Sequence, residues 1–295
     1  MAMHGEFNGS ERPAADDESG AAPGHAYCLD LVRRADPDRF LCTLLAPAKL
    51  RPTLLALYAF NVALGRAAET GGEPVLAQMR LAFWRESIAG LFAGRPAAEP
   101  ILAALAEAVD GLPRAAFERL IDAHEGTLAG PPKTREALLD RLDAGPRVLF
   151  ELALAAAGLE GAHALARDAG RAFGLSGTLR AAAWHARAGR LTLPLDLLAA
   201  ESIAPEDVLE CRPTPGLARV AAALAATAKT HLAAARAVRR EVPPAGRAVL
   251  LPLRLAGADL ARLRRRGHDL FDPRVAARGA GRVIAVLWGA ASRHY

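Results

Sequence analysis

Proline or glycine interrupts this chain about every 15 to 25 residues, and apolar residues recur at helical spacing between the interruptions. Pro52 begins one such segment, which runs to about Ala68 and carries Leu54, Leu57 and Tyr58 on one face. Aromatic residues make up only 5% of the chain, whereas Ala, Leu and Arg are abundant. This composition favours helices over strands, so we predict an all-α fold.

The chain is long enough for one large domain or two ordinary ones. At 295 residues, 52% of them hydrophobic, it can bury a sizeable core. We expect that domain to span residues 25–295, because no connection between the predicted helices has the composition of an interdomain linker. Residues 1–24 carry five acids and one arginine among small residues, which predicts a disordered acidic tail. Helices are predicted at residues 52–68, from Pro74 onward, and near 98–110, 114–128, 134–157, 160–186, 216–241, 245–266 and 279–292.

The cysteines and the apolar runs predict a reducing compartment. Cys28, Cys42 and Cys211 lack metal-ligand spacing, and an odd number is a poor disulfide framework. No uncharged apolar run reaches the roughly 18 residues of a membrane span, and the start of the chain lacks the layout of a signal peptide. The acids of the tail also disfavour a mitochondrial transit peptide. We therefore expect a cytoplasmic protein.

Positive charge is concentrated in the last third of the chain. Residues 211–295 contain 16 basic and four acidic residues, a formal charge of +12, whereas the whole chain carries +5. Such a segment is typical of a surface for anionic lipid or an acidic partner, or its arginines simply solvate helix faces. The densest run has none of the interleaved aromatic residues of a nucleic-acid groove, so no nucleic acid is expected. We predict that this run faces an anionic membrane: Arg262, Arg264, Arg265 and Arg266.

Several motifs occur in a specific order from Tyr27 onward. They are Asp36-Pro37-Asp38-Arg39-Phe40, Pro47 with Arg51, Ala56-Leu57-Tyr58-Ala59-Phe60, Arg80 with Trp84-Arg85, Ala172-Phe173 through Leu179-Arg180, and Ala186 through Leu195. In order and spacing they resemble the squalene/phytoene synthase family. The resemblance implies a single-domain, isoprenoid-synthase-like helical bundle around a central cavity.

Enzymes of that family join two isoprenoid diphosphates head to head, and two acid-rich motifs on facing helices hold their Mg²⁺. Magnesium needs such hard oxygen ligands beside the substrate phosphates. Aligned on the Tyr-Ala-Phe segment, the first motif of Asp-Asp-x-x-Asp type falls on Gly65, Arg66 and Glu69, of which only Glu69 is acidic. The acids of the second motif fall on Ala181 and His185. The motif positions therefore remain, although most of their acids are missing.

Basic side chains replace or surround the missing acids. A cavity lined by Arg66, Arg180, His185 and Arg187 would repel Mg²⁺, because unit charges about 4 Å apart interact by roughly 4 kcal/mol at an effective dielectric of 20. The resemblance thus implies no catalytic residue, no metal and no cofactor. Arginine forks can bind phosphate without a metal, so an isoprenoid or lipid ligand stays compatible with this pattern. The candidate cavity or anion-binding residues are Arg51, Tyr58, Asn61, Arg180, His185, Arg187 and Arg190.

Simpler roles are open for several of these residues. A lone histidine on a helix, such as His185, is often a hydrogen-bonded core or surface residue. Tyr58 and Trp84 are favoured as core residues over substrate platforms. Interior glycine costs about 1 kcal/mol relative to alanine, so close helix packing is expected at a glycine series. This series is Gly170, Gly174 and Gly177.

Further segments distinguish one branch of the family. They are Leu41-Cys42 with Leu44-Leu45, Ala59-Phe60-Asn61-Val62, Leu193-Pro194-Leu195-Asp196, Asp269-Leu270-Phe271-Asp272-Pro273 and the run from Trp288 to Tyr295. They resemble the assembly factors of respiratory complex I, the NADH:ubiquinone oxidoreductase. The resemblance implies partners among complex I subunits or assembly intermediates, and a peripheral location at the inner face of the membrane. The alternative is an active prenyl-diphosphate transferase with an altered Mg²⁺ site around Glu69, Glu73 or other acids.

Overall fold

Helices form the whole of the regular structure in the described part of the chain. The computed structural model describes residues 23–69, 73–95, 98–277, 279, 281–292 and 295. Its α-helices are α1 (Pro23–Ala35), α2 (Pro37–Thr43), α3 (Arg51–Ala68), α4 (Pro74–Phe92), α5 (Pro100–Ala106), α6 (Arg114–Gly126), α7 (Arg135–Ala144), α8 (Pro146–Ala156), α9 (His163–Arg187), α10 (Leu195–Ala200), α11 (Pro205–Leu209), α12 (Pro215–Ala237), α13 (Pro244–Leu250), α14 (Pro252–Arg265), α15 (Pro273–Ala276) and α16 (Gly281–Ser292). Short 3₁₀ helices span Ala48–Leu50 and Thr127–Ala129. The all-α prediction is confirmed.

Proline and capping residues account for where many helices begin. Pro37, Pro74 and Pro215 lie in the first turns of their helices, where the missing N–H has no intrahelical partner to lose. The side chain of Asp36 accepts a hydrogen bond from the backbone N–H of Arg39 and caps α2. The helix starts predicted from proline therefore agree with the structure at α3 and α4.

Two helices predicted as continuous are each divided in two. The segment 134–157 breaks at Gly145 and Pro146 into α7 and α8, and the segment 245–266 breaks before Pro252 into α13 and α14. Proline inside a helix lacks the N–H that the preceding turn requires, and its ring clashes with that turn. These two long-helix predictions were wrong, because each proline begins a new helix instead of continuing the preceding one.

The first described helix begins two residues before the predicted start of the domain. Helix α1 begins at Pro23, so residues 23 and 24 belong to the domain, while residues 1–22 of the predicted tail lie outside the described residues. Gly24 is buried, and a Cβ atom on it would lie 2.6 Å from the backbone carbonyl oxygen of Pro100. This close approach of α1 to the start of α5 explains why the domain extends to residue 23.

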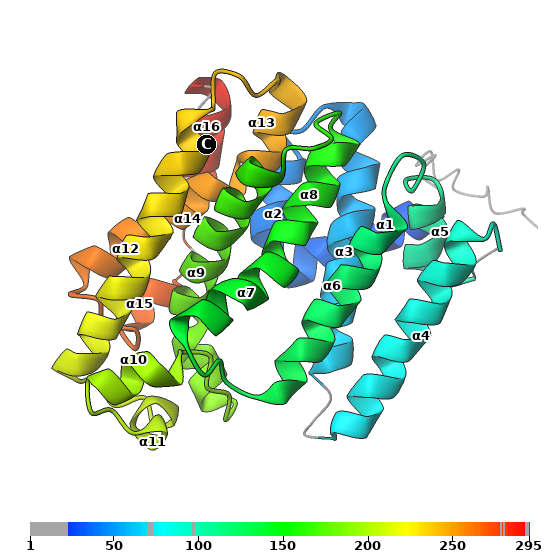
Figure 1. Cartoon of the computed structure of the whole chain (residues 1–295). Coiled ribbons are helices and arrows are strands. Elements are labelled where there is room, and N and C mark those ends of the chain that lie inside the picture. The colour runs from blue at the N-terminus through cyan, green and yellow to red at the C-terminus, as the bar shows by residue number, and fades with distance from the viewer. Residues whose placement is uncertain (1–22, 70–72, 96–97, 278, 280, 293–294) are drawn as a thin grey trace, which may run out of the picture.

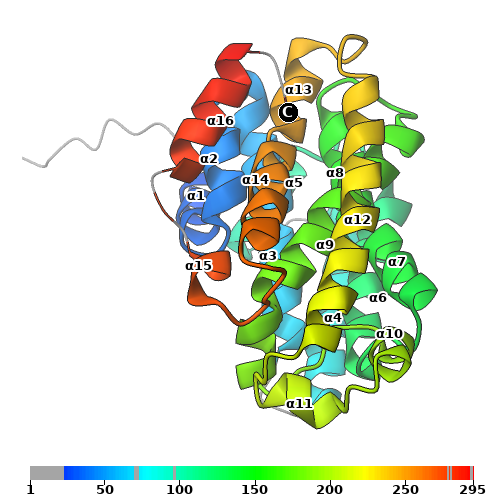
Figure 2. The same ribbon diagram turned by 90° about the vertical axis from the view of Figure 1, so that its left-hand side faces the viewer.

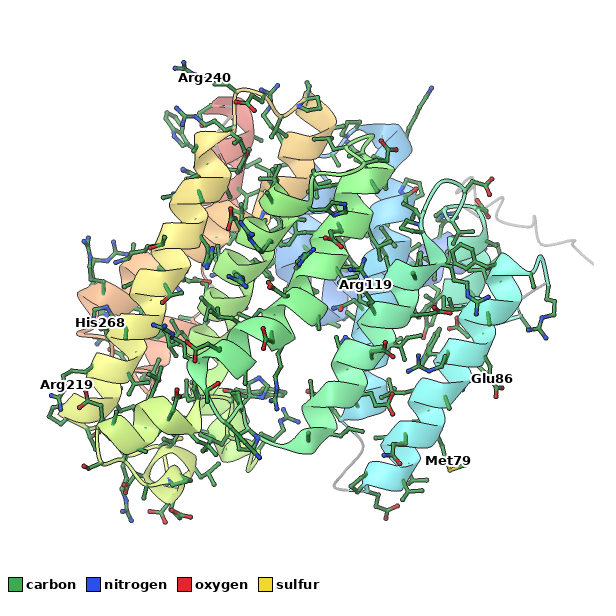
Figure 3. The ribbon with its side chains drawn as sticks, in the orientation of Figure 1. Met79, Glu86, Arg119, Arg219, Arg240 and His268 are labelled. Carbon is green, nitrogen blue, oxygen red and sulfur yellow. The ribbon has the colours of Figure 1, made fainter. Side chains whose placement is uncertain are left out.

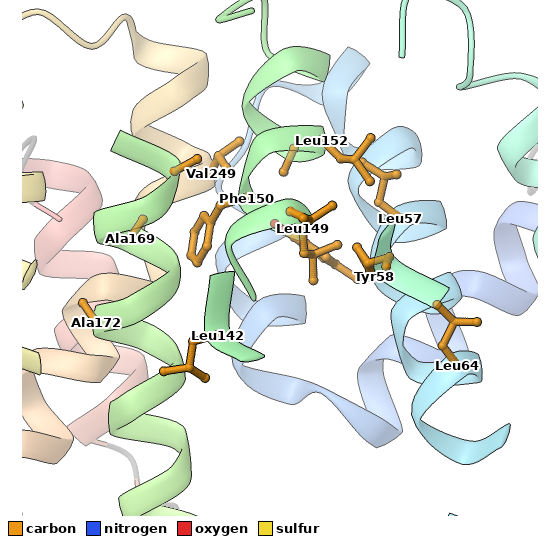
Figure 4. Close-up of a cluster of buried hydrophobic side chains, with 14 of the residues drawn as sticks. Leu57, Tyr58, Leu64, Leu142, Leu149, Phe150, Leu152, Ala169, Ala172 and Val249 are labelled. Atoms are coloured by element: carbon orange, nitrogen blue, oxygen red, sulfur yellow. The ribbon is translucent and has the colours of Figure 1, made fainter. Parts of the chain in front are cut away.

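Helix α8 lies between α3 and α9 in the bundle. It packs against α3 on one side and against α9 on the other, while α9 also contacts α12 and α14 (Figures 1 and 2). Figure 4 shows the apolar side chains that fill this region, among them Leu57 and Tyr58 of α3 and Leu149 and Phe150 of α8. The core therefore fixes the end of α3, which carries the first motif, relative to α9, which carries the second.

Two glycines of α9 permit its close packing. A Cβ atom on Gly170 would lie 2.5 Å from the backbone Cα of Arg147, and one on Gly174 would lie 2.6 Å from a methyl carbon of Leu142. Around the Cβ position of Gly177, no atom of the described structure lies within 4 Å, apart from its chain neighbours and the backbone of its own helix. The packing prediction is confirmed for Gly170 and Gly174 and is wrong for Gly177.

Candidate functional site

Arg190 connects the two motif positions. Helix α9 ends at Arg187, Gly189 follows at φ +69°, and the N–H of Arg190 turns back to donate to the carbonyl oxygen of His185 at 2.8 Å. A left-handed residue after a helix end is usually glycine, because it has no Cβ to clash. The reversal returns the Arg190 side chain along the last turn of α9. Its Nε donates to His185 Nδ1 at 3.3 Å, and its Nη2 lies 3.4 Å from Glu69 Oε1.

The Arg190 nitrogen nearest Glu69 forms no hydrogen bond with a described residue. Glu69 is the residue that ends α3, and its separation from Arg190 is that of an ion pair without hydrogen-bond geometry. The Nη2 atom of Arg190 is buried and has no hydrogen-bond partner among the described residues. The guanidinium carbon also lies 4.6 Å from the ring centroid of Trp184, a cation–π distance. The Nη2 of Arg190 thus lies beside Glu69 and forms no hydrogen bond with a described residue, so its N–H groups could donate to an anion.

His185 is neutral at physiological pH. Burial, together with the positive charge of Arg190, lowers its pKa to about 4. Because its Nδ1 accepts the hydrogen bond from Arg190, its proton lies on Nε2. The simpler of the two predicted roles, a hydrogen-bonded helix residue, agrees with this geometry.

The face of α3 that carries the first motif packs against α6. Asn61 Oδ1 lies 3.3 Å from His124 Nε2, and a Cβ on Gly65 would lie 3.8 Å from the ring of that histidine. Burial lowers the pKa of His124 to about 4, so the neutral ring donates its Nε2–H to Asn61. His124 was not among the predicted site residues, because it comes from a different helix and no local motif marks it.

The four residues predicted to line one cavity lie apart. Arg66 is about 100° around α3 from Gly65 and lines a groove against α4. Arg180 points into a buried ionic cluster, whereas Arg187 is exposed at the end of α9. His185 is the member of this set that contacts Arg190, which also reaches Glu69.

Arg180 belongs to a buried network of two acids and two arginines. Its Nη2 lies 3.6 Å from Asp38 Oδ2, and its Nε lies 3.3 Å from Asp259 Oδ2. Arg282, only 6% exposed, donates to both acids from the other side. Buried charges require such pairing because each has lost its hydration. The positive charge of Arg180 is therefore balanced within the network.

Arg51 and Tyr58 lie outside the Arg190 contact as well. Arg51 Nε donates to the carbonyl oxygen of Ala46 at 2.8 Å, which ties the start of α3 to the preceding loop. Tyr58 is buried with the Arg39 guanidinium 5.4 Å from its ring centroid, and burial raises the pKa of its hydroxyl. Trp84 is also buried, edge-on to Phe60 at 5.6 Å. The preferred prediction of core roles for Tyr58 and Trp84 is confirmed.

The four arginines at the end of α14 do not all face outward. Arg262 Nη1 donates to the carbonyl oxygen of Ala277 at 2.6 Å and approaches Asp259, so it does not face outward. Arg264, Arg265 and Arg266 are exposed. The predicted outward surface therefore loses Arg262, since the chain returning through α15 covers it.

A family model described as squalene/phytoene synthase matches residues 32–280, which includes both motif positions and Arg190. The chain belongs to the squalene/phytoene synthase family. Among solved structures of similar fold, the squalene synthase HpnC from Alicyclobacillus acidocaldarius superposes with a TM-score of 0.75 at 24% identity, over 83% of this chain and 95% of that one. A dehydrosqualene synthase bound to a ligand gives a TM-score of 0.79 at 17% identity, over 91% and 95%. The isoprenoid-synthase-like fold implied by the resemblance is confirmed.

Curated relatives of this squalene/phytoene synthase family member fall into two groups by name. The NADH dehydrogenase (ubiquinone) complex I, assembly factor 6, of Mus musculus is 29% identical over 265 residues, 88% of this chain and 80% of that protein. The Homo sapiens protein of the same name is 28% identical over 273 residues, 91% and 82%. A phytoene synthase of Rhodobacter capsulatus is 31% identical over a shorter 205 residues, 65% and 59%. The resemblance to the assembly-factor branch is thereby confirmed.

Proposed function

We propose that this chain is a catalytically inactive member of its family that assists the assembly of respiratory complex I. The observation that carries the proposal is the ion pair between Arg190 and Glu69, which engages the one acid left at the positions of the two motifs. The similarity to proteins named complex I assembly factor 6, over 88% of the chain, supports the assembly role.

The donor set between the motifs does not suit Mg²⁺. A magnesium–diphosphate site needs carboxylates from both motifs, and here the second motif offers Ala181 and a neutral His185 beside a guanidinium. Among the described residues, no three His, Cys, Asp or Glu side chains converge in a way that could hold a metal ion. The alternative of an active prenyl-diphosphate transferase, favoured by the similarity to the Rhodobacter phytoene synthase, would need such a group.

Anion binding without a metal is compatible with this geometry. The Nη2 of Arg190, which forms an ion pair but no hydrogen bond, and the Nε2–H of His185 are donors near the ends of α3 and α9. Arginine binds phosphate oxygens strongly through such N–H groups. We place a diphosphate or another isoprenoid or lipid anion at Arg190, with assembly intermediates or subunits of complex I as the protein partners.

The proposed location is the inner, cytoplasmic face of the membrane, with peripheral attachment. In the described part of the chain no helix is both long and apolar enough to cross a bilayer. Helix α16 lies at the edge of the bundle beside α14 and α2 (Figure 2), and its outer side chains are 43% to 68% exposed. These side chains are Val283, Ile284, Leu287 and Trp288. A helix with such an apolar outer face can lie in the lipid interface, and the exposed arginines of α14 add attraction to anionic lipid.

Gene deletion tests the proposal directly. The measurements are NADH:ubiquinone oxidoreductase activity in isolated membranes and, in parallel, a profile of carotenoids and hopanoids. We expect complex I activity to fall while the isoprenoid profile stays unchanged, and a plasmid copy of the gene to restore the activity. Normal complex I activity with a missing carotenoid or hopanoid would overturn the proposal in favour of the transferase.

A further inference from the structure

A groove between α3 and α4 includes one of the motif positions, Arg66. Its volume is about 470 Å³, within the range of small-molecule sites. On the α3 side it is lined by Ala63 and Arg66, whereas Asn61 and Gly65 on another face of the same helix pack toward His124. The groove therefore lies on a different face of α3 from the one that packs against His124.

The α4 side of the groove is apolar and exposed. Leu76, Met79 and Phe83 follow one another at spacings of three and four residues, and between 41% and 64% of each is exposed. Met79 points away from the bundle in Figure 3. Trp84 forms part of the lining beneath them, with its ring buried. Adjacent exposed apolar side chains on a folded domain mark binding sites, because leaving them in water is unfavourable.

Two arginines add positive charge to this apolar groove. Arg66 and Arg80 both line it and are exposed, and neither forms an ion pair, hydrogen bond or ring contact with any described residue. Arg85, one turn further along α4, differs because it pairs with Asp122 at 2.7 Å and with Glu125 at 3.1 Å. The guanidinium groups of the groove are thus available to an anion, unlike that of their neighbour.

We propose that this groove binds a single-chain anionic amphiphile. Its phosphate or carboxylate head would be held by Arg66 and Arg80, and its hydrocarbon chain would lie on the exposed Leu76, Met79 and Phe83, with the buried Trp84 beneath them. Two guanidinium forks match the oxygens of such a head, and the apolar side chains remove the hydrocarbon from water. This inference goes beyond the proposed assembly role and places a ligand on the side of α3 that faces α4.

Tryptophan fluorescence can report binding at this groove. The chain has three tryptophans, so the variant Trp184→Phe/Trp288→Phe keeps Trp84 alone. Both substituted side chains are more than half exposed, and the fold should tolerate the change. We expect monomeric dodecyl phosphate, titrated into this variant at low salt, to produce a saturable change in Trp84 emission. The affinity for uncharged dodecyl maltoside should be lower by at least about tenfold, since it forms no charge-assisted hydrogen bonds.

Variants assign the binding to named side chains. Arg66→Gln/Arg80→Gln should weaken dodecyl phosphate binding by about tenfold or more, because two charge-assisted contacts are lost. Met79→Glu, at an exposed position, should weaken it through repulsion of the head and loss of apolar contact. Arg240→Gln is the matched control, since Arg240 is exposed, lies far from the groove (Figure 3) and has no ion pair with a described residue. It should bind as the parent does.

Several outcomes would overturn the groove assignment. They are no saturable change, equal affinity for dodecyl maltoside, unaltered affinity in Arg66→Gln/Arg80→Gln, or a change only with vesicles that contain phosphatidylglycerol. The last result would mean adsorption to a membrane surface instead of a ligand site. Complex I activity in the deletion strain complemented with Arg66→Gln/Arg80→Gln tests the assembly role independently. Failure of the groove assignment can therefore be told apart from failure of the assembly role.

Discussion

Arg282, on the last helix, forms a two-point ion pair with Asp38, which lies 244 residues earlier in the chain. Its Nε lies 3.0 Å from Asp38 Oδ1, and its Nη2 lies 2.7 Å from Oδ2. The remaining nitrogen, Nη1, donates to Asp259 of α14. This arrangement joins the first part of the domain to α14 and α16, and it neutralises carboxylates that are removed from water.

Removing the Arg282 guanidinium should be strongly destabilising. Arg282→Ala leaves Asp38 and Asp259 with Arg180 as their main partner, and breaking a buried pair on one side typically costs about 3–5 kcal/mol. We expect a loss of that size in the free energy of unfolding, measured by urea titration with circular dichroism. Arg240→Ala, at an exposed position, should change it by less than about 0.5 kcal/mol. A loss below about 1 kcal/mol in Arg282→Ala would contradict this role of the network.

Two glycines in α9 should respond oppositely to alanine. A Cβ on Gly170 meets backbone atoms of Arg147 at 2.5 Å, so α8 must move and Gly170→Ala should destabilise by about 1–3 kcal/mol. Around Gly177 the described structure leaves the Cβ position open, so Gly177→Ala should stabilise by up to about 1 kcal/mol through helix propensity. Thermal and urea unfolding of the two variants measure both effects. Equal changes in the two would refute the close packing of α8 and α9.

The stability of the fold should depend on the protonation of His124. Burial lowers its folded-state pKa to about 4, against about 6.5 for the unfolded chain. Between these values the unfolded chain binds more protons, so stability falls as the pH decreases from 6.5 to 4, by up to about 1.4 kcal/mol per pH unit. His124→Gln keeps a donor for Asn61 and should reduce this slope. Urea unfolding from pH 7 to 5 gives the comparison, and identical slopes for parent and variant would exclude the effect.

Diphosphate chemistry should be absent. We expect no Mg²⁺-dependent release of pyrophosphate from farnesyl or geranylgeranyl diphosphate, because Glu69 is engaged by Arg190 and the second motif has no acid. Arg190→Gln frees Glu69 but supplies no second carboxylate, so this variant should be equally inactive. A coupled pyrophosphate assay with an active family enzyme as the positive control makes the measurement. Release above the no-protein rate in the parent chain would support the transferase alternative.

Membrane attachment should have an apolar and an ionic component. Ile284→Ser/Trp288→Ser should weaken binding to vesicles at any salt concentration, since each buried large apolar side chain contributes about 1.5–3 kcal/mol. Arg264→Gln/Arg265→Gln/Arg266→Gln should weaken binding mainly at low salt, by about 1 kcal/mol per arginine near the surface. Co-sedimentation with vesicles containing phosphatidylglycerol, at 0.1 M and 1 M salt, separates the two, because the Debye length falls from about 10 Å to about 3 Å. Unchanged binding in both variants would place the attachment elsewhere.

The order of helices and the loss of acids were readable from the sequence. Proline positions and apolar spacing predicted α3 and α4 well, because helix starts and amphipathic faces are local properties. The same local reasoning did not predict the helix breaks at Pro146 and Pro252. The identities of Gly65, Arg66, Ala181 and His185 are equally local, so the loss of acids at the motif positions needed no structure.

Contacts between distant residues were decided by the tertiary structure alone. From sequence, Arg66, Arg180, His185 and Arg187 were equivalent basic residues near one predicted cavity. Packing turned Arg66 toward α4, buried Arg180 between Asp38 and Asp259, and placed Arg190 against Glu69. The physical reason is that residue type and spacing determine how a helix forms and which face is apolar. The partner that a long charged side chain reaches depends instead on how several helices pack, through contacts between residues many turns apart in the chain.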